Sequence, residues 1–207
     1  MKGLLIKDFL ALKQQGKIFL AILAFYGIYC ISFDNLGMLV GMVVLICVMM
    51  PLTTWAYDEK SRWDKYALSM PVPRKTVVLS KYAFALLTEL AGMALVAVFG
   101  VALVFYSKEI SSEEFFYTLL AVGGIGLGFL SLIIPLLFKF GVEKARFIIL
   151  LVAFLPSVLL ILLQDMGLQG PNPETLRLLS YLSPLFLMVM LWVSYKISLS
   201  IYNKKEF

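Results

Sequence analysis

Histidine is absent from this sequence of 207 residues, and charged residues make up only 15% of it. The missing histidine removes the commonest protein ligand for transition metals and the commonest general acid or base. We therefore predict no catalytic residue and no metal site. A soluble domain has about a quarter of its residues charged, so the low charge argues against water as the main solvent. Hydrophobic residues, by contrast, make up 61% of the chain.

The sequence also has only two cysteines and lacks the P-loop motif for nucleotides. The two cysteines, Cys30 and Cys47, lie in apolar runs without CxxC spacing, which indicates small buried hydrophobes rather than a disulfide or a metal pair. No GxxxxGK[ST] motif occurs, so the chain has no P-loop with which to hold a nucleotide. We expect no cofactor bound by this chain, and any ATP and Mg chemistry has to come from a partner.

Long apolar runs are what the sequence has in abundance. They are about 18 to 25 residues long, the length needed to cross the hydrocarbon core of a bilayer as a helix. Hydropathy predicts an all-α integral membrane protein with six transmembrane helices, at 17–33, 36–57, 76–106, 115–138, 147–164 and 178–202. Short connections leave no room for a soluble domain, so residues 1–207 are predicted to form a single transmembrane domain.

The basic start of the chain is followed by apolar residues, as in a signal peptide. No small-x-small cleavage site follows residues 18–32, however, so we interpret this stretch as a retained first span.

Lysine and arginine lie almost entirely on one side of the predicted membrane. All but two of the 18 fall in the N-terminal segment, the connections after the second and fourth spans, or the C-terminal segment. The exceptions are Lys108 and Arg177, on a side that also carries Asp34, Glu109 and Asp165. The positive-inside rule predicts a multi-pass protein of the cell membrane with both termini in the cytoplasm. This bias also explains the net charge of +5 without nucleic acid as a partner.

The N-terminal segment 1–16 has the pattern of an interfacial helix. Leu5, Phe9 and Leu12 recur at helical spacing, and charged residues such as Asp8 fall largely on other faces. We expect this helix to lie on the inner leaflet of the bilayer before the first span begins.

The longest cytoplasmic connection, which follows the second span, mixes charged residues with aromatic ones. Residues 58–72 are predicted to form a short amphipathic helix, with Trp63 and Ala67 four residues apart. Pro71 and Pro73 are expected to end this helix before the third span begins.

Polar and small residues inside the spans are further candidates for a functional role. Glu89 is the one carboxylate well inside a predicted span, where its burial costs roughly 2.5 to 3.5 kcal/mol at mid-membrane on insertion scales. Two roles remain open for it, a structural polar contact and a place in a translocation path. GxxxG spacings occur at Gly37 and Gly41 and at Gly124 and Gly128, and they allow helices to approach closely within a chain or between subunits.

The segment from Asp58 to Tyr82, DEKSRWDKYALSMPVPRKTVVLSKY, resembles the permease subunits of type-2 ABC exporters. It is similar to the small six-span branch that includes bacterial exporters of phenol-soluble modulins and of peptide antibiotics. Members of that branch carry a comparable D-E-K-x-x-W-x-x-Y-x-x-S-x-P-x-x-R stretch after the second span. The amphipathic start and the six-span plan extend the resemblance over the whole chain.

The resemblance implies a permease domain that forms a homodimer or heterodimer and binds two ABC ATPase subunits, which hold ATP and Mg. It also implies that residues 58–72 form a coupling helix that docks in a groove on each ATPase. The predicted ATPase contacts are Asp58, Glu59, Arg62, Trp63, Asp64, Lys65 and Tyr66. The implied activity is ATP-driven export of an amphipathic or hydrophobic substrate, such as a cytolytic or antimicrobial peptide. Unlike larger relatives, the chain lacks an extended extracellular domain.

Two other classes of function remain as alternatives. A secondary transporter or channel that needs no ATPase predicts paired polar sites or broken helices near mid-membrane, and Glu89 alone gives this little support. A membrane-embedded enzyme is disfavoured by the missing histidine and by the lack of clustered carboxylates in the spans. The sequence leaves open the substrate, the spans that line its path, and the choice between secretion and self-protection.

Overall fold

The computed structural model describes residues 1–13, 15–33, 36–69, 71–106, 112–165 and 173–205, and these residues form helices with no strand among them. The helices are α1 Lys2–Lys13, α2 Gly16–Phe33, α3 Leu36–Lys60, α4 Trp63–Ser69, α5 Arg74–Tyr106, α6 Ser112–Asp165 and α7 Pro173–Asn203. The predicted all-α class is therefore confirmed for the part of the chain that the structure describes.

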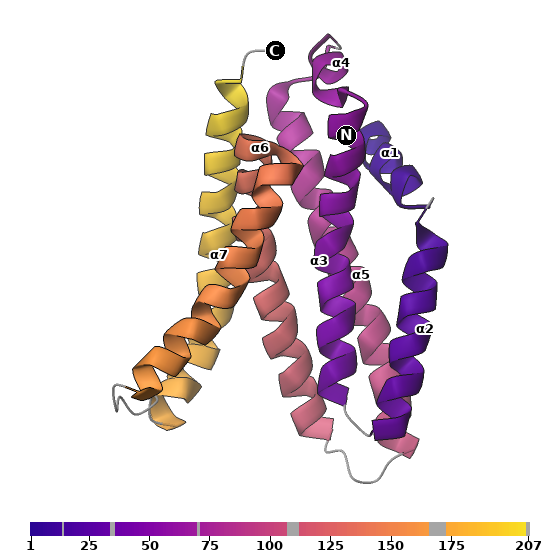
Figure 1. Cartoon of the computed structure of the whole chain (residues 1–207), viewed down its shortest axis with the longest axis vertical. Coiled ribbons are helices and arrows are strands. Elements are labelled where there is room, and N and C mark those ends of the chain that lie inside the picture. The colour runs from indigo at the N-terminus through magenta and orange to yellow at the C-terminus, as the bar shows by residue number, and fades with distance from the viewer. Residues whose placement is uncertain (14, 34–35, 70, 107–111, 166–172, 206–207) are drawn as a thin grey trace.

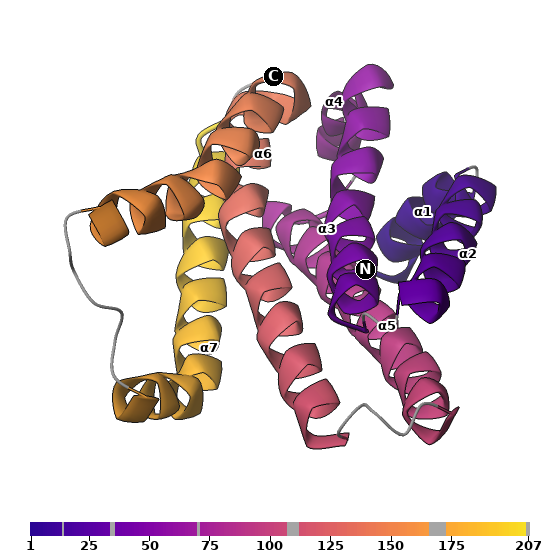
Figure 2. The same cartoon turned by 60° about the horizontal axis from the view of Figure 1, so that its bottom comes forward.

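Successive long helices run in alternating directions along one bundle (Figure 1). α1 and the short α4 lie towards the same end, to which α7 also brings the C-terminus. We call this the α4 end of the bundle. From it α2 and α5 run away, while α3 and α7 return to it (Figures 1 and 2).

α6 covers 54 residues and comprises two helices that meet at a kink; the sequence predicts two spans here, 115–138 and 147–164. It is not one straight helix, because Gly141 has φ 75° and ψ 178°. This backbone conformation lies outside the helical region and suits glycine, which has no side chain to clash. The first half of α6 approaches the α4 end and the second half turns back (Figure 1). Gly141 therefore separates the two predicted spans.

Four of the described helical segments are long and apolar enough to cross a membrane, by length and composition alone. They are Met38–Lys60, Arg74–Val98, Phe115–Leu151 and Ser183–Asn203. The third of these includes the Gly141 turn, and the apolar stretch Gly16–Tyr29 of α2 is shorter than the rest. The structure thus supports a multi-pass membrane protein, and the count of six spans remains a prediction.

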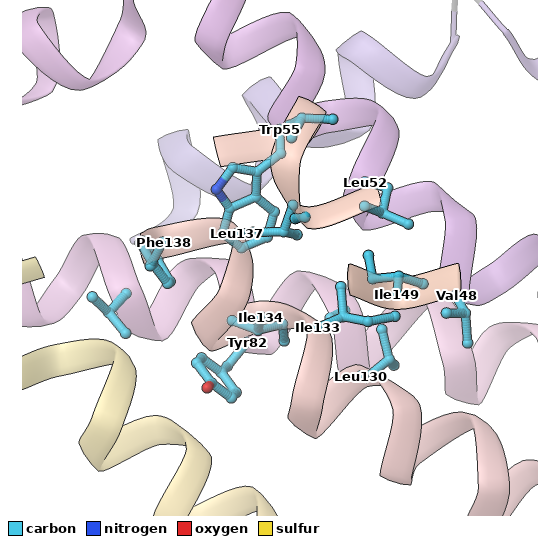
Figure 3. Close-up of a cluster of buried hydrophobic side chains, with 14 of the residues drawn as sticks. Val48, Leu52, Trp55, Tyr82, Leu130, Ile133, Ile134, Leu137, Phe138 and Ile149 are labelled. Atoms are coloured by element: carbon cyan, nitrogen blue, oxygen red, sulfur yellow. The ribbon is translucent and has the colours of Figure 1, made fainter. Parts of the chain in front are cut away.

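The packed centre of the bundle lies where α3, α5 and α6 meet. Buried side chains from these helices surround Trp55 of α3, whose ring packs edge-to-face on Phe138 of α6 at 5.2 Å between centroids. Figure 3 shows this cluster, with Tyr82 of α5 beside Ile134. In the span segment of α3, 61% is buried within the chain, against 17% in that of α7. α3 is therefore the central helix, and α7 presents most of its surface to the surroundings.

The two short helices are shorter than the sequence predicts. α1 covers Lys2–Lys13 of the expected 1–16. α4 covers Trp63–Ser69 of the expected 58–72, because Asp58 and its neighbours continue α3 to Lys60. Arg62, with φ 53°, separates the two helices in a left-handed conformation typical of the residue that follows a helix C-terminus. The amide of Arg62 donates to the Glu59 carbonyl at 3.1 Å, which closes the last turn of α3.

Candidate functional site

The α4 end carries a network of two lysines and two aspartates that joins three helices. Lys81 Nζ of α5 donates to Asp8 Oδ1 of α1 at 2.9 Å and to Asp58 Oδ2 of α3 at 2.6 Å. Lys7 Nζ of α1 donates to Asp58 Oδ1 at 2.6 Å and lies 3.2 Å from Asp8 Oδ1. We call these four residues the ion quartet. Their formal charges cancel, which is the condition under which ionised groups are tolerated in a buried place.

Burial of the quartet overturns part of the sequence interpretation of α1. Asp8 was expected on a polar face of an interfacial helix, yet it is only 1% exposed, and Phe9 is 46% exposed. The apolar periodicity of α1 did not predict its buried face correctly, because the helix packs on α3 and α5 through ionic groups as well as through Leu12. α1 is therefore bound to the bundle rather than merely laid beside it.

The two lysines of the ion quartet each lie over a tryptophan ring, and one of these rings belongs to α4. Lys7 Nζ lies 4.3 Å from the ring centroid of Trp63, the first residue of α4, and Lys81 Nζ lies 4.9 Å from that of Trp55. Cations at these distances over indole rings are attracted by the negative ring face. One lysine thus contacts α3 and α4 at once, so α4 is held by α1 as well as by its own chain neighbours.

Glu59 joins the end of α3 to the turn in α6. Its Oε2 accepts the backbone N–H of Val142 at 2.8 Å, one residue beyond Gly141. The first amides of a helix have no partner within that helix, so a carboxylate here acts as an N-cap for the second half of α6. The cap also requires space, because a Cβ at Gly141 would press on the carboxylate of Glu59.

α7 is joined to the same end through its last turn. Arg74, the first residue of α5, donates to the backbone carbonyls of Tyr202 and Asn203. Lys205 lies 3.5 Å from Asp64 of α4. These groups neutralise the negative end of the α7 dipole and satisfy carbonyls that the helix leaves free. Every helix around α4 is therefore connected to it or to the segments that flank it.

The predicted ATPase contacts divide into two groups in the structure. Arg62, Lys65 and Tyr66 are exposed, and Tyr66 is the most prominent aromatic of α4 at 59% exposure. Trp63 and Asp64 are half-buried, and Ala67 on the opposite face is 1% exposed.

The other group is engaged within the chain. Asp58 and Glu59 belong to α3 and hold the contacts described above. The structure therefore gathers the seven residues at one end but gives the last turn of α3 and the exposed face of α4 different surroundings.

Glu89 lies far from this end, inside the span segment of α5. Its side chain is 0% exposed, and neither carboxylate oxygen has a hydrogen-bond partner among the described residues. Val44 of α3 and Gly126 of α6 lie beside it, and a Cβ at Gly126 would overlap Oε1. Glu89 therefore lies where α3, α5 and α6 pack closely together.

The GxxxG glycines show looser surroundings. A Cβ at Gly41 would meet no atom within 4 Å, and at Gly124 or Gly128 it would meet only Leu187 of α7, at 3.4 and 3.8 Å. Gly37 lies in α3, but the surroundings of its side-chain position lie outside the described part of the chain. Close approach occurs instead at Gly92, Gly100, Gly123 and Gly126, where a Cβ would overlap a side chain of a neighbouring helix, and the spacing rule singles out none of these four.

Sequence analysis also missed a hydroxyl cluster at the centre of the bundle. Tyr82 Oη of α5 lies 2.6 Å from Ser194 Oγ and 2.8 Å from Ser198 Oγ of α7, and Ser194 donates to the Ser131 carbonyl of α6. The signal available was the spacing of Ser194 and Ser198, four residues apart on one helix face. Such groups hydrogen-bond across helices in membrane proteins.

Comparison with known proteins agrees with this architecture. Over residues 3–203 the sequence matches the family model described as ABC-2 family transporter protein. Neither a search of curated proteins nor a search of solved structures finds a match. The matched region includes all seven helices, from the quartet residues of α1 to the last turn of α7. The chain therefore belongs to the ABC-2 family, as a multi-pass membrane permease whose family implies an ABC ATPase as its partner.

Proposed function

We propose that this permease exports an amphipathic or hydrophobic substrate, such as a cytolytic or antimicrobial peptide, with energy from ATP hydrolysed by its partner. The functional unit is a dimer of permeases, identical or different, with two ATPase subunits that hold ATP and Mg. The chain itself hydrolyses no ATP, because its sequence contains no P-loop.

Six membrane crossings are supported by the course of the chain. α2, α3, α5, the two halves of α6, and α7 run alternately away from and towards the α4 end (Figure 1). Apart from Arg177 near the start of α7, the lysines and arginines of the described helices gather towards the same end, in α1, in α4, around Gly141 and where α3, α5 and α7 meet it. By the positive-inside rule this end is cytoplasmic, which places both termini in the cytoplasm and α4 within reach of an ATPase.

One observation carries the proposal: α4 exposes Tyr66 and Lys65, and Arg62 just before it is also exposed, while the opposite side of α4 is bound to the rest of the chain. An exposed aromatic among cations is the composition found where protein interfaces gain most of their binding energy. α4 is thus suited to be a coupling helix whose outer face docks on the ATPase.

The contacts on the inner side of α4 provide a route by which movement of this helix is passed to the membrane helices. A push on α4 displaces the last turn of α3, from which Asp58 leads to α1 and α5 and Glu59 leads to α6. Packed elements with fixed polar links move as units, so nucleotide-driven docking can switch the dimer between inward-open and outward-open states.

The test is retention of the ATPase. Permease and ATPase are co-purified in detergent as wild type and as the variant Arg62→Glu/Tyr66→Ala, and ATP turnover is measured. We expect the variant to lose the ATPase while its thermal unfolding midpoint stays unchanged. Lys139→Glu, the same change of charge on an exposed residue of α6, serves as the matched control. If wild type retains no ATPase, or the α4 variant retains as much, an ATPase-independent transporter or channel becomes the better account.

A further inference from the structure

Glu89 is a buried acid that the coupling contacts do not use. It lies in the apolar segment Arg74–Val98, is 0% exposed, and has no hydrogen-bond partner for either oxygen among the described residues. Buried polar groups in native proteins are almost always satisfied, and ionisable groups inside spans face a partner or a water-filled path. A buried carboxyl group whose two oxygens both lack a hydrogen-bond partner indicates a ligand that is not part of the described helices.

The helices around Glu89 do not supply a cation. Every lysine and arginine of α3, α5 and α6 lies near the α4 end of its helix or at the Gly141 turn. Lys81, on the same helix, is eight residues nearer that end, roughly 12 Å at the helical rise. It is also bound by Asp8 and Asp58 in the ion quartet. The charge of Glu89 is therefore not balanced from within its own packing site.

A divalent metal ion does not fit the site. No group of three metal-ligating side chains is found among the described residues. Calcium takes six to eight oxygen ligands, and zinc takes four ligands, whereas Glu89 has no cluster of such side chains around it in the described part of the chain. The Thr88 hydroxyl already donates to the Ala85 carbonyl at 2.9 Å. A single carboxylate is, however, sufficient for an ammonium or guanidinium group, which donates charge-assisted hydrogen bonds to it.

The site is closed in this conformation. Gly126 of α6 lies against the carboxylate, because a Cβ at position 126 would overlap Oε1 of Glu89 and would also overlap Val44 of α3. Separation of α6 from α5 would open this site to a ligand. Both helices are linked at the α4 end to the last turn of α3, through Lys81 and through the Val142 amide. Opening of the site is therefore tied to the same contacts that we assign to coupling.

We propose that Glu89 binds a positively charged group, an ammonium or guanidinium, on the amphipathic substrate that the permease transports. The proposal rests on the proposed function and adds a chemical class to its substrate. The apolar walls of the bundle take the hydrophobic part of the molecule, and Glu89 takes the cation. When α6 closes on α5, Gly126 fills the place of the ligand and expels it.

The test uses the complete complex in nanodiscs of phosphatidylcholine, which has no net charge. The probe is a fluorescent amphipathic peptide of leucine and lysine, compared with the same peptide after acetylation of its lysines. We expect the wild-type complex to bind the lysine peptide about tenfold more tightly than the acetylated one, as one charge-assisted hydrogen bond requires. Glu89→Gln, which keeps the size of the side chain, should bind both peptides equally.

Thr88→Val is the matched control, since it removes a buried polar group from the same turn, and it should keep the tenfold preference. Empty nanodiscs measure binding to lipid alone. The inference is overturned if wild type shows no preference or if Glu89→Gln retains it. Retention of the ATPase and its turnover are measured on the same samples. If the wild-type complex retains no ATPase or shows no ATP turnover, the proposed function is contradicted. If ATPase retention and turnover are normal but Glu89→Gln keeps the preference for the lysine peptide, only the cation site is contradicted.

Discussion

Glu59 Oε2 accepts the backbone N–H of Val142 at 2.8 Å, and this bond joins two residues that are 83 positions apart in the sequence. One end of it lies just before α4, and the other lies just after Gly141. The bond therefore connects the predicted docking helix to the hinge of α6, and it can be tested apart from the docking surface itself.

Glu59→Ala should destabilise the second half of α6 by about 1 kcal/mol, because loss of an N-cap has roughly that cost. Glu59→Gln keeps an acceptor oxygen and should retain most of the stability. We further expect Glu59→Ala to lower transport per ATP hydrolysed without loss of bound ATPase. Thermal unfolding in detergent and coupled transport in vesicles measure the two effects. Equal loss of ATPase binding in both variants would instead make Glu59 a docking residue.

Lys81→Met should be strongly destabilising, by about 3 to 5 kcal/mol, because it leaves Asp8 as a buried charge with less compensation. Adding Asp8→Asn should recover part of the loss, since the stranded charge is then removed. The comparison is made from denaturant unfolding of the two single variants and the double variant. Strict additivity of the two single effects would show that the pair is not coupled.

Gly126→Ala should destabilise the bundle by about 1 to 3 kcal/mol, the usual cost of overpacking, because the new methyl group would overlap Glu89. Gly41→Ala should be neutral or slightly stabilising, since a Cβ there meets nothing within 4 Å and alanine favours helix. Unfolding midpoints of the two variants give the comparison directly. A neutral Gly126→Ala would contradict the close packing of α5 on α6.

The orientation of the chain can be tested by thiol labelling in whole cells. In a background with Cys30 and Cys47 replaced by serine, Lys65→Cys should be protected from a membrane-impermeant maleimide until the cells are lysed. Lys108→Cys, in the acidic connection predicted on the outer side, should label in intact cells. Reversed labelling would invert the proposed topology and remove α4 from the cytoplasm.

The sequence was sufficient to predict where the helices lie. The predicted spans 36–57 and 76–106 correspond to α3 and α5 within three residues at each end, because apolar length alone identifies such segments. Gly141 lies inside the charged connection 139–146 predicted between the fourth and fifth spans, but hydropathy could not show that the turn occurs at this one glycine within an otherwise helical stretch.

Side-chain pairing could not be predicted in the same way. Asp8 and Lys81 are 73 positions apart, and hydropathy treats both simply as polar. Only the packing of α1 on α5 reveals that they neutralise one another. Likewise, the spacing rule selected Gly124 and Gly128, while the close contacts of this part of α6 fall at Gly123 and Gly126, because that rule describes a helix face without knowing which neighbour the face meets.

The ion quartet also sets an order of events during biosynthesis. Lys7 and Asp8 leave the ribosome first, Asp58 follows in the last turn of α3, and Lys81 follows only after α2 and α3 have been made. Until then, Asp8 is best solvated at the membrane surface, because an uncompensated buried charge is costly. α1 can dock only once the third long helix is inserted, so its docking reports that the first half of the permease has assembled correctly.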